Sequence, residues 1–304
     1  MSGLRKFFKA VHGHGKATVA GDEAKPKPIV GQPLIERASG YVTEERLERA
    51  LNDGELQLYY QPLTDIKTGL IVGAEALIRW NHPESGLMLP AAFIPSAEQS
   101  HAIIDIGEWV LREACGRFQE YRNAGFLDLI VSVNVSVKQF ESMGFFDEVT
   151  TALKRSHLPA ANLVLEITET TAMKNVEQSV PIMRRLHELG VKIAIDDFGT
   201  GYSSLAALKQ FPLDELKIDR SFVRTCTSDP DDAAIVMAVI SLANGMGLTA
   251  VAEGVETQRQ LEYLRSLDCQ IMQGFLGGAA MPADAFGRVM RGEDDPFKSI
   301  AALP

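Results

Sequence analysis

The chain has 304 residues, of which 46% are hydrophobic and 23% charged, and its net charge is −10. The acid excess argues against binding to a nucleic-acid polymer, which normally requires a basic face, and no apolar run approaches the roughly 18 residues of a transmembrane helix. The length allows either one large domain or two small ones, because α/β barrels reach about 250 residues as one unit.

Residues 1–40 differ from the rest of the chain. They carry seven basic and three acidic residues, so this tail is +4 and residues 41–304 are −14. Gly, Pro and Lys dominate GHGKATVAGDEAKPKPIVGQP, which predicts a disordered linker. No apolar segment followed by a cleavage site indicates secretion, so we expect a cytoplasmic protein. Weak attachment of the basic segment 4–11 to an anionic membrane is a less favoured alternative.

From Tyr41 onward, apolar runs alternate with segments of helical periodicity, which is typical of βα units. Eight such runs are predicted to be strands, the number that a closed α/β barrel requires. They span residues 56–63, 70–78, 129–136, 163–168, 191–197, 215–219, 248–254 and 270–274. Residues 41–304 are therefore predicted to form one barrel.

Turn and cap residues refine this prediction. The five residues 65–69 (DIKTG) are too few for a crossover helix, so the first two strands should form an antiparallel hairpin in an irregular barrel. Asp229 and Pro230 predict the start of a helix, and Gly190 the end of another. The irregular spacing of Cys115, Cys226 and Cys269 predicts buried, reduced thiols without zinc or disulfides.

Polar residues interrupt the apolar runs at their carboxyl ends, where an α/β barrel builds its site. A single one of them is most simply an exposed or salt-bridged charge. Five carboxylates beside one lysine, however, would repel one another unless cations neutralise them. Oxygen ligands without His or Cys favour magnesium or manganese, and adjacent aspartates suit two metals about 3.5–4 Å apart. The residues are Glu75, Asn134, Glu166, Asp196, Asp197, Lys217, Glu253 and Gln273.

The same residues lie in motifs that resemble the EAL domains, which hydrolyse cyclic di-GMP. The resemblance covers about residues 42–291, in order and at compatible spacing. A kinase interpretation of Asp197-Phe198-Gly199 fails because no glycine-rich loop or HRD-type loop accompanies it, and no full GxGxxG supports a dinucleotide site. The matching motifs are EALIRW (75–80), VNVS (133–136), EITE (166–169), DDFGTGYSSL (196–205), LKID (216–219), AEGVE (252–256) and QGF (273–275).

The resemblance implies a modified TIM (β/α)8-type barrel with one antiparallel strand and a two-metal site that binds Mg²⁺ or Mn²⁺. It assigns Glu75, Asn134, Glu166 and Asp196 to the first metal, and Asp196, Asp197 and Glu253 to the second. Lys217 would hold the attacking water, Gln273 would orient it, and Glu253 would accept a proton.

The resemblance also implies the substrate contacts. Gln61 and Leu63 would lie beside the nucleotide, Arg79 would bind phosphate, and Glu169 would brace the loop after the Asp-Asp pair, near a dimer contact. The family commonly has bulkier and charged residues where this chain has Gly-Gly-Ala-Ala at 277–280. This departure puts substrate affinity in question more than chemistry.

We therefore expect a phosphodiesterase that opens cyclic di-GMP to linear 5′-pGpG, as a homodimer regulated through the tail or an unidentified sensor protein. Two alternatives stay open. A receptor that binds cyclic di-GMP without cleaving it is disfavoured by the complete ligand set. An enolase-like barrel with Lys217 as base leaves the Asp-Asp-Phe-Gly-Thr-Gly loop without a role.

Overall fold

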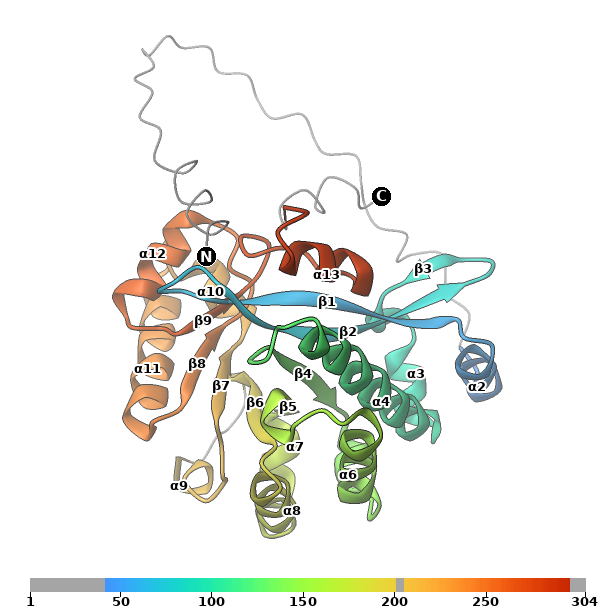
Figure 1. The fold of residues 1–304 in the computed structure, drawn as a ribbon. Coiled ribbons are helices and arrows are strands. Elements are labelled where there is room, and N and C mark those ends of the chain that lie inside the picture. Colours follow the sequence, from blue (N-terminus) through green and yellow to red (C-terminus); the bar gives the residue numbers. More distant parts are fainter. Residues whose placement is uncertain (1–41, 201–204, 296–304) are drawn as a thin grey trace.

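A closed barrel forms the centre of the protein (Figure 1). The structure, a computed structural model, describes residues 42–200 and 205–295, so the predicted tail 1–40 lies outside the described residues. Eight strands of the described chain close the barrel in the order β1-β9-β8-β7-β6-β5-β4-β2, with β2 pairing back to β1. They are β1 (Leu56–Asp65), β2 (Ile71–His82), β4 (Ile130–Val135), β5 (Leu163–Thr168), β6 (Lys192–Phe198), β7 (Glu215–Ile218), β8 (Thr249–Ala252) and β9 (Ile271–Gln273).

One strand of the barrel runs against the others. β1 pairs antiparallel with both β2 and β9, whereas the other neighbouring barrel strands pair in parallel. The turn between β1 and β2 is held by the Asp65 carboxylate, which accepts hydrogen bonds from the backbone N and the Oγ1 of Thr68 at 2.6 and 2.7 Å. The predicted barrel with one reversed strand is confirmed.

All eight predicted strands are present, and most of their ends lie within about two residues of the prediction. The largest difference is β2, which continues to His82 and pairs there with β3 (Gly86–Met88). A second short strand, β10 (Met281–Pro282), pairs with β1. The sequence did not predict β3 or β10, because runs of two or three residues carry no periodicity.

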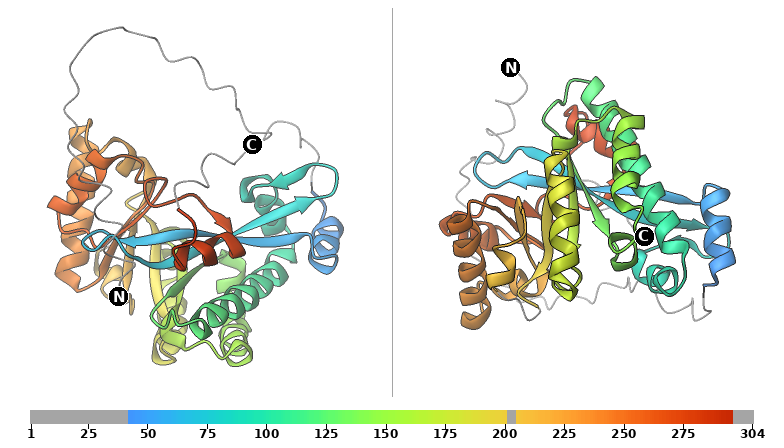
Figure 2. Two further views of the ribbon diagram at one scale, coloured as in Figure 1. Left: turned by 45° about the horizontal axis from the view of Figure 1, so that its top comes forward. Right: turned by 90° about the horizontal axis from the view of Figure 1, so that it is seen from below.

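Helices surround the strands on the outside (Figure 2). Asp229 caps α11 as predicted, since its side chain accepts from Asp231 N and Pro230 is the first helical residue. None of the helices in the described ranges has the length and apolar character that a membrane span requires. They are α2 (Glu44–Asn52), α3 (Ile94–Gln99), α4 (Ala102–Asn123), α5 (Val137–Phe140), α6 (Phe145–Ser156), α7 (Glu169–Lys174), α8 (Val176–Glu188), α9 (Leu205–Leu208), α10 (Arg220–Thr225), α11 (Pro230–Met246), α12 (Gln258–Ser266) and α13 (Ala283–Met290), with 3-10 turns at Pro90–Ala92 and Ala160–Asn162.

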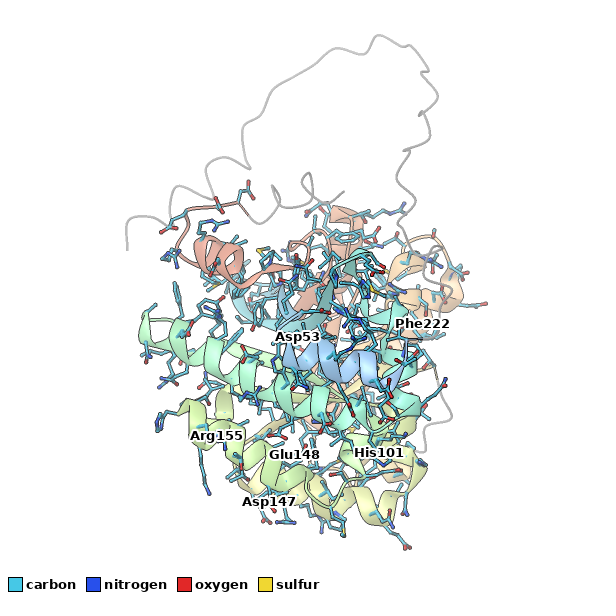
Figure 3. The ribbon with its side chains drawn as sticks, turned by 90° about the vertical axis from the view of Figure 1, so that its right-hand side faces the viewer. Asp53, His101, Asp147, Glu148, Arg155 and Phe222 are labelled. Carbon is cyan, nitrogen blue, oxygen red and sulfur yellow. The ribbon has the colours of Figure 1, made fainter. Side chains whose placement is uncertain are left out.

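Two apolar clusters stabilise this arrangement. The larger one lies between the strands and the helices and contains Trp80, Phe118 and Phe286, all at most 1% exposed. Charged side chains face outward on the helices, as Asp147, Glu148 and Arg155 show on α6 (Figure 3). The smaller cluster, which we call the floor, consists of Leu63, Ile130, Val164, Ala194, Val251 and Ile271. The predicted free cysteines are buried.

Candidate active site

Strand alternation places the floor and the predicted site on one face of the sheet. Side chains two residues apart on a strand point the same way. Val164 of the floor therefore shares its face with Glu166, and Ile271 shares its face with Gln273. We call the polar layer above the floor the mouth. It is formed by Glu75, Asn134, Glu166, Asp196, Lys217, Glu253 and Gln273, which come from seven neighbouring strands or the residues directly after them.

Lys217 lies at the centre of the mouth. It is 1% exposed, and its Nζ lies 2.7 Å from Glu166 Oε2 and 2.6 Å from Glu253 Oε1. The same Nζ lies 3.5 Å from Asp196 Oδ1 and 3.7 Å from Glu75 Oε2. One buried ammonium thus faces four carboxyl groups, and the sequence-predicted residues are brought together around it.

This arrangement shifts the ionisation of its members. Burial alone would lower the pKa of Lys217, but the surrounding carboxylates outweigh it and raise that pKa well above its usual value. Burial raises the pKa of Glu253 to about 7, although Lys217 opposes the shift. Burial and the charge of Glu75 also raise the pKa of Glu166 well above its usual value. One lysine is therefore too little positive charge for this layer.

Glu75 keeps its negative charge through its neighbours. Asn134 Nδ2 donates to Glu75 Oε1 at 2.6 Å, and Gln273 Nε2 donates to Glu75 Oε2 at 2.5 Å. Burial tends to raise the pKa of Glu75, but Lys217 and these hydrogen bonds lower it overall. The donation from Nδ2 leaves the Oδ1 of Asn134 available as a ligand.

The Asp-Asp pair forms a half-buried side of the mouth. One carboxylate oxygen from each of Asp196, Asp197 and Glu253 lies within 4.8 Å of the others, which is compact enough to hold a metal ion. Asp197 has a φ of 56°, a left-handed conformation that few non-glycine residues adopt, and among the described residues only His157 and Asp268, both outside the mouth, share it.

Asp219 joins this side of the mouth, although it was not predicted from the sequence as a site residue. Burial, the charge of Asp196, and the charge and hydrogen bond of Asp219 raise the pKa of Asp197 to about 6. Asp219 also caps α10, where its carboxylate accepts from the backbone N and the hydroxyl of Ser221. Its place in LKID, two residues after Lys217, was the available signal.

The donor set fits divalent cations. In two pairs of carboxyl groups, Glu75 with Glu166 and Asp197 with Asp219, burial and the charge of one member raise the pKa of the other, which is Glu166 in the first pair and Asp197 in the second. Cations would supply the positive charge that this cluster lacks, and oxygen donors suit hard metals. The acidic cluster could therefore bind metal.

Glu169 lies behind the Asp-Asp pair. It is 2% exposed, and its Oε2 accepts a hydrogen bond from Gly199 N at 3.0 Å. This is the geometry expected of a residue that braces the loop after Asp197. Residues 201–204 of that loop lie outside the described residues.

The three predicted substrate contacts occupy different places. Gln61 is half-buried in the mouth, where its Oε1 accepts from Gln273 Nε2 at 3.1 Å. Leu63 is 1% exposed and belongs to the floor, so a contact of its side chain with substrate stays a prediction. Arg79 lies on β2 beyond Glu75, with its guanidinium 5.4 Å from the centre of the Tyr59 ring. Burial lowers the pKa of Arg79.

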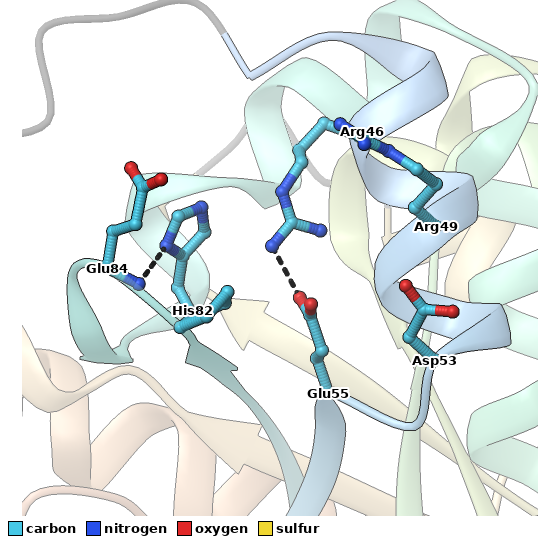
Figure 4. A pocket seen from close by; sticks show the side chains of 7 residues that line it. Arg46, Arg49, Asp53, Glu55, His82 and Glu84 are labelled. Carbon is cyan, nitrogen blue, oxygen red and sulfur yellow. Dashed lines mark hydrogen bonds and ion pairs between the residues drawn. The ribbon is translucent and has the colours of Figure 1, made fainter.

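A surface cavity of about 390 Å³ lies apart from these residues, between α2 and the β1–β2 hairpin (Figure 4). Arg46 donates to Glu55 at 2.6 Å and lies over the Trp80 ring, and Trp80 Nε1 also donates to Glu55. These contacts attach α2 to the hairpin. None of the residues that line the cavity is a predicted site residue.

Comparisons with known proteins agree on one family. The family model for the EAL domain matches residues 44–280. The bifunctional diguanylate cyclase/cyclic di-GMP phosphodiesterase MucR of Pseudomonas aeruginosa is 48% identical over 238 residues, which are 78% of this chain and 35% of MucR. The cyclic di-GMP phosphodiesterase NbdA of the same organism is 42% identical over 260 residues, 86% of this chain and 33% of NbdA.

Solved structures give the same result. A MucR phosphodiesterase structure in complex with c-di-GMP matches with a TM-score of 0.78 and 47% identity, covering 80% of this chain and 98% of the solved chain. The chain spans only about a third of the length of the two full-length curated relatives.

Proposed function

The chain belongs to the EAL domain family, as its motifs predicted, and we propose that it hydrolyses cyclic di-GMP to linear 5′-pGpG with two Mg²⁺ or Mn²⁺ ions. The observation that carries this proposal is the buried Lys217 ammonium, which four carboxyl groups surround in the barrel mouth. The named activities of MucR and NbdA support the choice of substrate.

Glu75, Asn134, Glu166 and Asp196 would hold one cation, and Asp196, Asp197 and Glu253 the other. Divalent cations held there would acidify a water and stabilise negative charge on the phosphate. The clustering of Asp196, Asp197 and Glu253 within 4.8 Å supports the second site. We add Asp219 as a neighbour of Asp197, because its negative charge contributes to the raised pKa of Asp197.

The remaining residues of the mouth would handle the water and the substrate. Lys217 would hold the attacking water, and Glu253, whose Oε1 lies 2.6 Å from Lys217 Nζ, would accept its proton. The water oxygen would bond to phosphorus as the bond from phosphorus to the 3′ oxygen breaks, which leaves a 5′-phosphate. Arg79 would bind phosphate oxygens through its guanidinium.

Product chromatography after incubation with cyclic di-GMP and either Mg²⁺ or Mn²⁺ tests the proposal. We expect 5′-pGpG with the wild-type chain and none with Glu75→Ala, because loss of this carboxylate removes a ligand. An exposed acid on α6 gives a matched control, Asp147→Ala, which should retain the rate. Tight binding of cyclic di-GMP without product under both metals would reject hydrolysis and favour a receptor.

We also propose that the protein forms a homodimer through α11. No charged residue occurs from Ala233 to Leu248, although the helix is on the surface and exposes Met237 (48%) and Met246 (36%). Because residues 41–304 carry a charge of −14, most faces of two copies would repel each other, whereas this face would not. Ile235 of α11 also lies near Gly199 of the Glu169-braced loop.

The oligomeric state in solution tests this interface. Light scattering should give a dimer for the wild type and a monomer for Met237→Glu, since the substitution places two charges in an apolar contact. Leu127→Glu changes another exposed apolar side chain (53%) and should leave the dimer intact. A wild-type monomer, or a Met237→Glu dimer, would contradict the proposal.

The location of the protein in the cell and its regulatory partner are also proposed. We propose a cytoplasmic location, and the free, buried Cys115, Cys226 and Cys269 support a reducing compartment. A separate sensor or regulatory protein is proposed as the input. Pull-down of the chain with its tail (residues 1–40) intact or deleted tests whether the tail recruits it.

A further inference from the structure

A chain of hydrogen bonds connects the loop after β9 with Glu75. Gln61 Nε2 donates to the backbone oxygen of Gly278 at 3.3 Å, and Gln61 Oε1 accepts from Gln273 Nε2 at 3.1 Å. Gln273 Nε2 also donates to Glu75 Oε2 at 2.5 Å. The strands bring these groups together, since Gln61 is paired with Glu75 across β1 and β2, and Leu63 with Gln273 across β1 and β9.

Both ends of this chain can only accept hydrogen bonds. A backbone carbonyl has no proton to donate, and an ionised carboxylate has none either. Gln61 must therefore turn its NH₂ group toward Gly278, which turns its oxygen toward Gln273. Gln273 must then donate both of its N–H groups, one to Gln61 and one to Glu75. The direction of the whole chain follows from its two ends.

One atom remains without a partner. Gln273 is 5% exposed, and its Oε1 has no hydrogen-bond partner among the described residues. We propose that the Gly278 carbonyl and Gln61 are positioning groups, which hold the Gln273 amide in one orientation and reserve its oxygen as an acceptor for the attacking water. This inference rests on the proposed hydrolysis, but the orientation itself does not.

The backbone of the loop explains how its carbonyl is held. Leu276 N donates to Val255 O, and Gly277 N and Gly278 N both donate to Gly274 O, at 2.9 to 3.0 Å. Gly278 has a φ of 132°, which an L side chain rarely adopts. The Gly-Gly-Ala-Ala stretch thus acts through a peptide oxygen and does not only remove bulk beside the substrate.

Two substitutions break the chain at different links. Gln61→Met keeps the length of the side chain and removes both hydrogen bonds. Gly278→Ala leaves the side chains of the mouth unchanged. It disfavours the backbone conformation in which the Gly278 carbonyl points toward Gln61. Gln57→Met is the matched control, because Gln57 lies on the same face of β1, four residues earlier, and its side chain makes no hydrogen bond to the mouth within residues 42–200 and 205–295.

The first measurement is made on the metal-free protein labelled with ¹⁵N in its glutamine side chains. The Gln273 amide, assigned with Gln273→Met, should give two distinct protons that exchange slowly with solvent. Gln61→Met and Gly278→Ala should speed that exchange at least about tenfold, and Gln57→Met should not. Unchanged protection in folded Gln61→Met protein would overturn the inference, whether or not cyclic di-GMP is hydrolysed.

The second measurement separates positioning from substrate binding. With Mn²⁺, both variants should lower kcat by about tenfold to 100-fold, whereas the Kd for cyclic di-GMP measured in chelator changes less than about threefold. A raised KM with unchanged kcat would make Gln61 a substrate contact only and overturn its positioning role. If the wild type does not hydrolyse cyclic di-GMP, the proposed function is wrong. The exchange measurement still tests the orientation of the Gln273 amide. Thermal unfolding of each variant confirms that it is folded.

Discussion

The floor and the buried part of the mouth lie on neighbouring strands of the barrel, yet their chemistry is opposite, and Asn134, Asp196 and Glu253 leave the mouth partly open to solvent. On β5, Val164 is 0% exposed and Glu166, two residues later, is 2% exposed. The floor packs apolar side chains without polar partners, whereas the mouth packs one ammonium and several carboxyl groups. Burial alone therefore does not tell a structural layer from a functional one.

The two layers differ in the free energy of burying their side chains. Apolar burial in the floor stabilises the fold by about 25 cal/mol per Å². Burial in the mouth raises the pKa values of Glu166 and Glu253, so the charged forms are disfavoured until positive charge is present. The protein thus has a stabilising layer that supports a layer organised for cations.

The largest effect is expected from Lys217→Ala. Removal of the ammonium should slow hydrolysis about 100-fold to 1000-fold with substrate binding largely preserved, because a positioned charge is lost from a buried site. It should also destabilise the metal-free protein by about 3–5 kcal/mol, since several carboxyl groups lose their counter-charge. Rates and thermal unfolding with and without Mn²⁺ measure both effects. Lys154→Ala on exposed α6 is the control, and an unchanged rate in Lys217→Ala would exclude Lys217 from the chemistry.

A substitution in the floor should lower the stability of the protein and leave the rate of hydrolysis unchanged. Ile130→Ala leaves a cavity beside Gly73, where the Ile130 side chain packs, and should lower the free energy of unfolding by about 3 kcal/mol. The kcat of the folded fraction should not change. Ile130→Val should cost only about 1 kcal/mol. A lower kcat for Ile130→Ala under conditions where the protein is fully folded would show that the floor and mouth are not separable.

A smaller effect is expected at the edge of the mouth. Glu169→Ala removes the acceptor of Gly199 N and should weaken metal binding and turnover about tenfold to 100-fold without unfolding the barrel. Glu169→Gln keeps an acceptor oxygen and should reduce metal affinity and turnover much less than Glu169→Ala does. Metal titration by calorimetry and the rate with Mn²⁺ measure the effect, and wild-type values in Glu169→Ala would exclude a bracing role.

The sequence predicted more of the strands than of the contacts between them. Alternation of apolar runs and helical segments was enough for eight strands, and the short DIKTG turn was enough for the reversed one, because both signals are local. The residues of the mouth were also predicted, since they interrupt apolar runs at strand ends. Their pairing around Lys217 was not, because it depends on how the barrel closes.

Contacts between residues far apart in the chain were the hardest to predict. Gln61 and Gly278 are separated by 217 positions, and nothing in either segment indicates that an amide meets that carbonyl. The effect of Asp219 on Asp197 was also missed, although the position of Asp219 two residues after Lys217 was an available signal. Glu215 is different, since it lies two residues before Lys217 on one strand, and alternation already placed it on the inner face.

Glu215 is an acid at the level of the floor, and it blurs the distinction between the two layers. It is paired with Ala194 of the floor across β6 and β7 and is 4% exposed. No hydrogen bond to its carboxyl group occurs within the described part of the chain. Burial raises the pKa of Glu215 to about 6, although Lys192 and Lys217 oppose the shift.

Glu215→Gln should therefore stabilise the protein, and only above a certain pH. The folded-state pKa of about 6 exceeds the ordinary value of 4.5, so the folded protein binds more protons than the unfolded chain between these values, and stability falls as pH rises through them. The penalty is complete above about pH 7 and amounts to at most about 2 kcal/mol, at 1.36 kcal/mol per pKa unit. Urea unfolding at pH 4 and pH 8 should show a gain from Glu215→Gln only at pH 8. An equal gain at both pH values would mean that the pKa of Glu215 is the same in the folded and the unfolded protein, so that burial imposes no charge penalty on it.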